Sequence, residues 1–191
     1  MLTLSGQAVG KTEVPPYKNK SLSIEKRVDD LMGRMTLREK VLQLQNRGAG
    51  RLDEIDRIFN GESYGCTHEM GTTAAECAAM YKELQQYMLT KTRLGIPIIT
   101  SVEGIQGILQ NNCTLFPHAL AQGSTFNPAL IQRMTEAAGE EAKVIGIHQI
   151  LSPVLDIARE LRWGRVEETF GEDPYLISEM GIASVSYTHL R

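Results

Sequence analysis

Apolar residues recur at helical spacing in the first third of the chain, and polar capping residues mark where helices begin. One apolar face, spaced i, i+4, i+7, i+8 and i+11, is formed by Ile24, Val28, Leu31, Met32 and Met35. This spacing predicts a helix over about residues 23–34. Residues 36–39 and 73–76 each read Thr-x-x-Glu, which is a capping box. They predict helices that run to about Leu44 and about Thr90.

Three further helices are predicted from their start and stop signals. Residues 53–59 form a short apolar-periodic stretch that Asn60-Gly61 ends. Asn127-Pro128 combines an N-cap with proline in the first turn, and the helix runs to about Ile145, where Gly146 closes it. The last predicted helix covers about residues 174–183.

Four short apolar runs are candidate strands. Residues 96–102 and 149–156 are apolar, β-branched and short, as in a buried parallel strand. Residues 62–66 are a weaker candidate, and the small residues of 119–123 suggest an inner strand. Strands that alternate with loops and helices indicate a parallel sheet with right-handed crossovers. We therefore expect an α/β domain over residues 21–191, preceded by an extended leader over residues 1–20.

Composition and charge exclude several classes of function. The 191 residues are 42% hydrophobic with a formal net charge of −3, so neither nucleic acid nor a membrane is expected as a partner. Neither a G-x-G-x-x-G nor a G-x-x-x-x-G-K-[ST] motif is present, so nucleotide binding has no motif behind it and no cofactor is expected. Cys66, Cys77 and Cys113 lack the spacing of a zinc site, so we interpret them as unpaired thiols and expect no metal.

The start of the chain leaves two interpretations open. Residues 1–8 are too short for a signal peptide, but they fit the end of one with small residues near Ala8. The alternative is a disordered leader that extends through Pro15-Pro16. The first interpretation predicts a periplasmic or secreted protein, and the second leaves a cytoplasmic location open.

The chemistry of the chain is concentrated in two loops that follow predicted strands. The loop at residues 161–174 holds the only tryptophan, Trp163, with two arginines and four acidic residues. Glu103 follows the earlier strand. The carboxyl ends of parallel barrel strands open on one face, so the two loops should meet there. Carboxylates and guanidinium groups around an aromatic ring suit a polyhydroxylated ligand. The alternative is a surface loop of salt bridges in which Trp163 is a local core residue.

The histidines do not indicate a catalytic triad, because none lies at an interpretable spacing from a serine or cysteine. They are His68, His118, His148 and His189. His118 follows Phe116-Pro117, where it would either face a cavity mouth or pack as a hydrogen-bonded histidine.

Six motifs occur in an order that resembles the N-terminal barrel of family 3 glycoside hydrolases, the β-glucosidase and β-xylosidase group. They are residues 31–41, 93–97, 116–117, 125–128, 153–156 and 162–174. The similarity covers about residues 24–183. The block at 162–174 is the most specific, because thirteen ordered positions rarely agree by chance. The resemblance implies a TIM-type parallel β/α barrel, of which this chain would be the first half.

The resemblance also implies a retaining mechanism on β-linked sugars, with a β-linked saccharide as substrate. It places Glu103 and Arg165 as sugar-binding residues and Glu168 as the partner that orients Arg165. Many members have Asp at the position of Glu103 and His at that of Gln106, which affects fine specificity. The Asp-Gln-Glu-Gly-Gly motif of the N-acetylglucosaminidase branch is absent, which favours a glucosidase or xylosidase.

Three functional groups of the family lie at positions that would follow Arg191 in this chain. They are the nucleophilic Asp, a Lys-His pair that binds sugar, and the acid/base. We therefore expect a truncated chain that is inactive by itself. Residues 184–191 do not resemble the family, so we expect the last residues of the chain to be foreign sequence. A half-barrel of about four strands would leave an open edge and would self-associate. One alternative is a non-catalytic sugar-binding or interaction fragment. A weaker alternative is an unrelated barrel enzyme for anionic substrates, with residues 46–50 as its anion loop.

Overall fold

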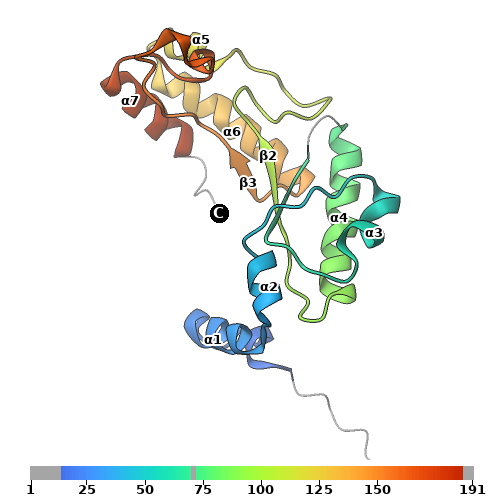
Figure 1. Cartoon of the computed structure of the whole chain (residues 1–191). Helices are drawn as coiled ribbons and strands as arrows, with labels where there is room; N and C mark the ends of the chain where they lie inside the picture. The colour runs from blue at the N-terminus through green and yellow to red at the C-terminus, as the bar shows by residue number, and fades with distance from the viewer. Residues whose placement is uncertain (1–13, 70–71, 187–191) are drawn as a thin grey trace, which may run out of the picture. The chain divides into compact units, whose positions relative to one another are not determined.

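The computed structural model describes residues 14–69 and 72–186, and Figure 1 shows the course of the chain. The chain forms two compact units, residues 1–41 and residues 42–191. The predicted signal-peptide remnant at residues 1–8 lies outside the described residues, and so do residues 187–191 of the predicted foreign end. In the part that is described, no helix is long and apolar enough to cross a membrane.

The first unit contains α1 (Ile24–Arg34), and α2 (Leu37–Leu42) begins in it. The Ser23 side chain caps α1. Thr36 and Glu39 hydrogen-bond reciprocally at the start of α2, as the capping box predicted. The extended arm predicted for residues 1–20 is wrong at η1 (Pro16–Lys18), which is a 3-10 turn. Proline presets φ for such a turn, and the Asp30 carboxylate accepts a hydrogen bond from the Tyr17 backbone N–H.

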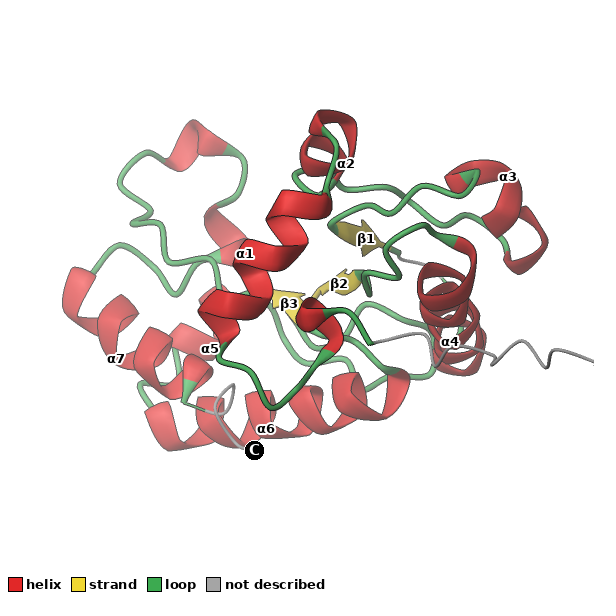
Figure 2. Ribbon diagram, turned by 90° about the horizontal axis from the view of Figure 1, so that it is seen from below, coloured by secondary structure: helices red, strands yellow, loops and turns green. Residues whose placement is uncertain are grey.

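The second unit is built on a three-stranded parallel sheet, visible at the centre of Figure 2. Its strands are β1 (Cys66–His68), β2 (Ile99–Glu103) and β3 (Gln149–Leu151), in the order β1-β2-β3. The predicted parallel sheet is confirmed, and its strands alternate with helices as expected of part of an α/β barrel. β1 begins where the predicted strand at 62–66 ends.

Two of the strand predictions need correction. Residues 119–123 form helix α5 (Ala119–Gly123) and not an inner strand. Their small size instead permits close approach, because a Cβ on Gly123 would lie 2.3 Å from the Phe170 carbonyl oxygen. The predicted strand at 149–156 ends at Leu151, and beyond it only an isolated bridge joins Val154 to Thr169.

The remaining helices begin and end close to their predicted bounds. Asn60 ends α3 with a φ of 47°, and Gly146 ends α6 with a φ of 88°. Thr73 and Glu76 form the capping box at the start of α4. The elements are η2 (Leu52–Glu54), α3 (Ile55–Phe59), α4 (Ala74–Lys91), α6 (Pro128–Ile145) and α7 (Pro174–Val185). These ends were predictable because caps depend on the residues next to them.

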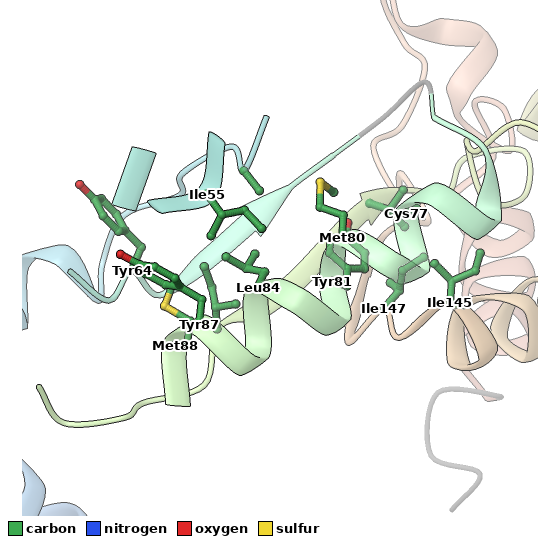
Figure 3. Packing of buried hydrophobic residues seen from close by; sticks show 14 of the residues in the cluster. Ile55, Tyr64, Cys77, Met80, Tyr81, Leu84, Tyr87, Met88, Ile145 and Ile147 are labelled. Carbon is green, nitrogen blue, oxygen red and sulfur yellow. The ribbon is translucent and has the colours of Figure 1, made fainter. Parts of the chain in front are cut away.

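The main core lies between the sheet and helices α4 and α6 (Figure 3). Buried side chains along one face of α4 pack there, including Cys77, Met80, Tyr81, Leu84 and Met88. A second cluster joins α5, α6, α7 and the loop before α7. It contains Ala119, Ile131, Phe170, Ile177, Met180 and Ala183.

Strand register decides which residues face away from this core. Paired residues of a parallel sheet share a face, and successive residues alternate. Val102 pairs with Ile150, and both pack in the helix-covered core. Glu103 pairs with Leu151, so these two residues share the opposite face with Ile99. Ile99 and Leu151 are 50% and 39% exposed, and this face is therefore open in the described part of the chain.

The first testable prediction concerns Tyr81, which links α4 to β2. Its hydroxyl group is buried and donates a hydrogen bond of 3.1 Å to the Ser101 carbonyl oxygen, and burial raises the pKa of the phenol. We expect Tyr81→Phe to lower the free energy of unfolding by about 0.5–1.5 kcal/mol, the net value of one hydrogen bond. Urea denaturation of both proteins measures the difference. An unchanged midpoint would show that this bond contributes nothing.

Candidate functional site

The carboxyl ends of β1 and β2 place two polar side chains next to each other. Glu103 is the last residue of β2 and His68 is the last residue of β1. Their side chains are 31% and 21% exposed, and 4.0 Å separates His68 Nε2 from Glu103 Oε1. The next residue, Gly104, has no space for a side chain, because a Cβ atom there would lie 2.1 Å from Cγ2 of Ile150.

The loop after β3 presents Arg165. It is made of two short turns, η3 (Leu161–Trp163) and η4 (Val166–Glu168), separated by Gly164 at φ of 83°. Phe170 fixes the end of this loop, because its ring is 3% exposed and packs in the second core cluster. Arg165 itself is on the surface, so the loop is anchored by Phe170 and displays a guanidinium group.

Arg165, which directly precedes η4, forms an ion pair with Glu168 at the end of η4. Arg165 Nε lies 2.9 Å from Glu168 Oε2, and Arg165 Nη2 donates to the same oxygen at a shorter distance. The side chains are 54% and 19% exposed, respectively. Hydrogen bonding to Arg165 lowers the pKa of Glu168, and hydrogen bonding to Glu168 raises the pKa of Arg165. Both groups are therefore ionised at neutral pH.

Electrostatics show that segments far apart in sequence meet near this pair. After Glu168, the negative charges of Asp156 and Glu103 also raise the pKa of Arg165. After Arg165, His118 makes a smaller electrostatic contribution that lowers the pKa of Glu168. Gly104, which directly follows Glu103, and Glu168 also line the same pocket. The three residues predicted from the sequence, Glu103, Arg165 and Glu168, thus lie in one region.

Sequence reasoning did not assign His68 and Asp156 to this region. The signal was present for Asp156, which ends the predicted strand at 149–156 just as Glu103 follows the strand before it. His68 lies two residues beyond the predicted strand at 62–66. Only the register of β1 against β2 shows that His68 lies next to Glu103.

The structure also decides between alternatives for Trp163 and His118. Trp163 is 38% exposed, so it is not a local core residue. The salt-bridge interpretation applies to Arg162, whose Nε and Nη2 pair with Glu160 at 2.8 Å and 2.7 Å. His118 is exposed at the start of α5, which contradicts the packing interpretation.

The anion loop considered for residues 46–50 is not available to a ligand. The Ala49 backbone N–H already donates to the Glu69 carboxylate, and the same oxygen accepts from Thr67 Oγ1 at 3.0 Å. A protein carboxylate thus occupies the position that an anion would take.

Cys66, Cys77 and Cys113 are free thiols, and burial raises the pKa values of Cys77 and Cys113. Over residues 14–69 and 72–186, no three His, Cys, Asp or Glu side chains are grouped as metal ligands.

A second prediction follows from the depressed pKa of Glu168. The ordinary pKa of a glutamate is near 4.5, and the pKa of Glu168 in the folded chain is lower. The ion pair therefore stabilises the fold fully above pH 4.5, and this stabilisation is lost as the pH falls through the pKa of the folded state. We expect Glu168→Gln to lower stability slightly at pH 7, because Arg165 is more than half exposed. The difference from the wild type should shrink between pH 4.5 and pH 3.

Urea denaturation at pH 7, 4.5 and 3 measures this difference. Glu160→Gln is the control, because both partners of that pair are more exposed, at 56% for Glu160 and 89% for Arg162. A difference between Glu168→Gln and the wild type that grows as pH falls would contradict the assigned ion pair.

Comparison with known proteins agrees with the resemblance in the motifs. The sequence profile described as "Glycosyl hydrolase family 3 N terminal domain" matches residues 36–190. A putative β-xylosidase of Formosa agariphila is 34% identical over 190 residues, which cover 92% of this chain and 25% of that protein. A periplasmic β-glucosidase/β-xylosidase of Dickeya chrysanthemi is 30% identical, over 86% of this chain and 28% of that protein. The chain thus spans about a quarter of the length of these relatives.

Solved structures are similar over the same region. A β-glucosidase from Erythrobacter marinus superposes with a TM-score of 0.78 at 30% identity, covering 90% of this chain and 24% of that one. A mutant β-glucosidase from Listeria innocua in complex with laminaribiose has a TM-score of 0.69 at 31% identity, covering 87% and 24%.

Proposed function

The chain belongs to family 3 of the glycosyl hydrolases, as part of its N-terminal domain, and from this premise we propose that it forms the sugar-binding half of a β-glycosidase site. The proposed enzyme removes terminal sugars from β-linked glycosides, as a β-glucosidase or β-xylosidase. The names of the relatives from Formosa and Dickeya support these two substrate classes, and the laminaribiose complex of the Listeria enzyme supports a β-linked glucoside.

The observation that carries the proposal is the convergence of Glu103 and Arg165 from separate loops onto one exposed region. In this proposal, the Glu103 carboxylate accepts hydrogen bonds from sugar hydroxyl groups, and Arg165 donates them. A guanidinium group has five N–H donors, and the pair with Glu168 engages those on Nε and Nη2. In this proposal, the pair with Glu168 fixes the guanidinium plane, and the remaining donors bind the sugar.

We further propose that residues 1–191 do not catalyse hydrolysis by themselves. A retaining mechanism needs a nucleophilic carboxylate and a second carboxyl group roughly 5–5.5 Å away as acid/base. In the proposed site, Glu103 binds hydroxyl groups, and Glu168 is held by Arg165. In this proposal neither acts as the nucleophile, and the nucleophile and the acid/base are not among the residues assigned to this site.

Purified chain 1–191 tests both parts of this proposal. Incubation with an aryl β-glucoside and an aryl β-xyloside should give no release of the aryl group. Titration with glucose and xylose, followed by NMR, should shift signals from residues near Glu103 and Arg165. Measured turnover would overturn the proposed inactivity, and the absence of shifts with both sugars would overturn the sugar-binding function.

A third prediction is self-association through the open face and edge of the sheet. Ile99 and Leu151 are exposed on the face opposite the helices, and β3 is the last strand of the sheet. Exposed apolar edges of this kind favour pairing with another copy. We expect the 21.2 kDa chain to elute as a larger species in size-exclusion chromatography, and Leu151→Lys to shift it toward monomer. A monomeric wild type would contradict the prediction.

We propose a periplasmic or secreted location, with the cytoplasm as the alternative. The Dickeya relative, which is named a periplasmic enzyme, supports it. Cells that express the gene from its native start codon are separated into periplasmic, cytoplasmic and secreted fractions. Detection of the protein by antibody in one of these fractions distinguishes the locations.

A further inference from the structure

His68 lies beside the proposed sugar-binding carboxylate, on the same face of the sheet. His68 pairs with Ser101 in the parallel register, and Glu103 follows Ser101 by two residues. Paired residues and residues two apart share a face, so His68 and Glu103 project from the same side at neighbouring strand ends. This is the face that carries the exposed Leu151 and not the face covered by α4 and α6.

The distance between the two side chains suits a shared ligand atom. At 4.0 Å, His68 Nε2 and Glu103 Oε1 are too far apart for a direct hydrogen bond. One hydroxyl oxygen can nevertheless lie within hydrogen-bond distance of both atoms. A hydroxyl group can accept a hydrogen bond from an Nε2–H group and donate one to the carboxylate at the same time, which neither a methyl group nor a second carboxylate can do.

The strand ends that carry the two side chains are fixed by buried polar contacts. Ser101 Oγ donates to the Thr67 carbonyl oxygen at 2.7 Å, which ties β2 to the residue directly before His68. Tyr81 holds the Ser101 carbonyl oxygen from the helix side. The backbone positions from which His68 and Glu103 project are therefore fixed by the scaffold, which lowers the cost of ordering the pair around a ligand.

We propose that His68 is a specificity-determining residue that, together with Glu103, binds one hydroxyl group of the terminal sugar. This inference rests on the proposed sugar-binding function and adds a residue from β1 to it. A sugar that lacks this hydroxyl group, or carries it in the opposite configuration, leaves both side chains without their shared partner.

The experiment measures dissociation constants of chain 1–191 by NMR titration with glucose and with its 2-, 3-, 4- and 6-deoxy derivatives. His68→Phe keeps a ring of similar shape but removes the donor, and it should weaken glucose binding by about 2- to 12-fold. The loss should disappear for one deoxy sugar, the one that lacks the bound hydroxyl group. His68→Gln retains an N–H donor at a similar reach and should restore most of the affinity. Circular dichroism confirms that each variant is folded.

Each outcome decides a different claim. If the wild type binds none of these sugars, the proposed function fails. If it binds glucose but His68→Phe binds equally well, or loses the same factor for all five sugars, the assignment of His68 is overturned. A His68→Gln variant as weak as His68→Phe also overturns it, because a donor would then be of no use at this position.

Discussion

Replacement of Arg165 by alanine is expected to weaken the binding of glucose and xylose to the chain by at least about tenfold. In the proposed site, the guanidinium group is the charged donor for the sugar, and hydrogen bonds to charged groups are among the strongest single polar contacts. Glu168 fixes the direction of this group through Nε and Nη2, so little conformational entropy is lost when a ligand binds. NMR titration of both proteins measures the ratio of dissociation constants.

Arg162→Ala is a matched control in the same loop. Arg162 also forms a bidentate pair with a carboxylate, that of Glu160, which lowers the pKa of Glu160 to about 2. Its side chain is 89% exposed, and neither Glu103 nor Asp156 contributes to the pKa shift of Arg162. Sugar affinity should therefore be unchanged in Arg162→Ala. Equal losses in the two variants would show that the loop as a whole, and not Arg165, governs binding.

The helices of this chain were predictable because their determinants are local. Thr73 and Asn127 each cap the helix that begins beside them, and their side chains accept backbone hydrogen bonds as predicted. Ser23 caps α1 in the same way, although only the apolar spacing predicted that helix. Such caps require no knowledge of the rest of the fold. The pair between Arg165 and Glu168 is equally local, three residues apart in one turn.

Strands were harder to place because their bounds depend on partners far away in sequence. β1 is fixed by pairing with residues 99–101, and this pairing moved it to the end of the predicted run at 62–66. The same long-range register places His68 beside Glu103, which no spacing in the sequence reveals. Residues 119–123 were mistaken for a strand because small residues suit both a crowded strand and a helix packed closely on Phe170.

Loss of the Phe59 ring is expected to cause the largest loss of stability. Phe59 is 0% exposed in the core cluster beside α4, with its ring 5.6 Å from that of Tyr64 in an edge-to-face arrangement and 6.3 Å from that of Tyr87. Truncation of a buried phenylalanine to alanine costs about 3–5 kcal/mol, from lost burial and the cavity that remains. Since small domains unfold with only about 5–15 kcal/mol, Phe59→Ala should leave a large fraction of the chain unfolded at moderate urea.

Phe126→Ala makes the same chemical change at a ring that is 74% exposed, and its stability should stay within about 0.5 kcal/mol of the wild type. Urea denaturation of the wild type, Phe59→Ala and Phe126→Ala measures both changes in stability. The midpoint should shift only in Phe59→Ala, where a buried cavity forms. Similar midpoints for both variants would contradict the packing assigned to Phe59. A large loss in Phe59→Ala alone would show that this aromatic cluster stabilises the unit from which Glu103 and His68 project.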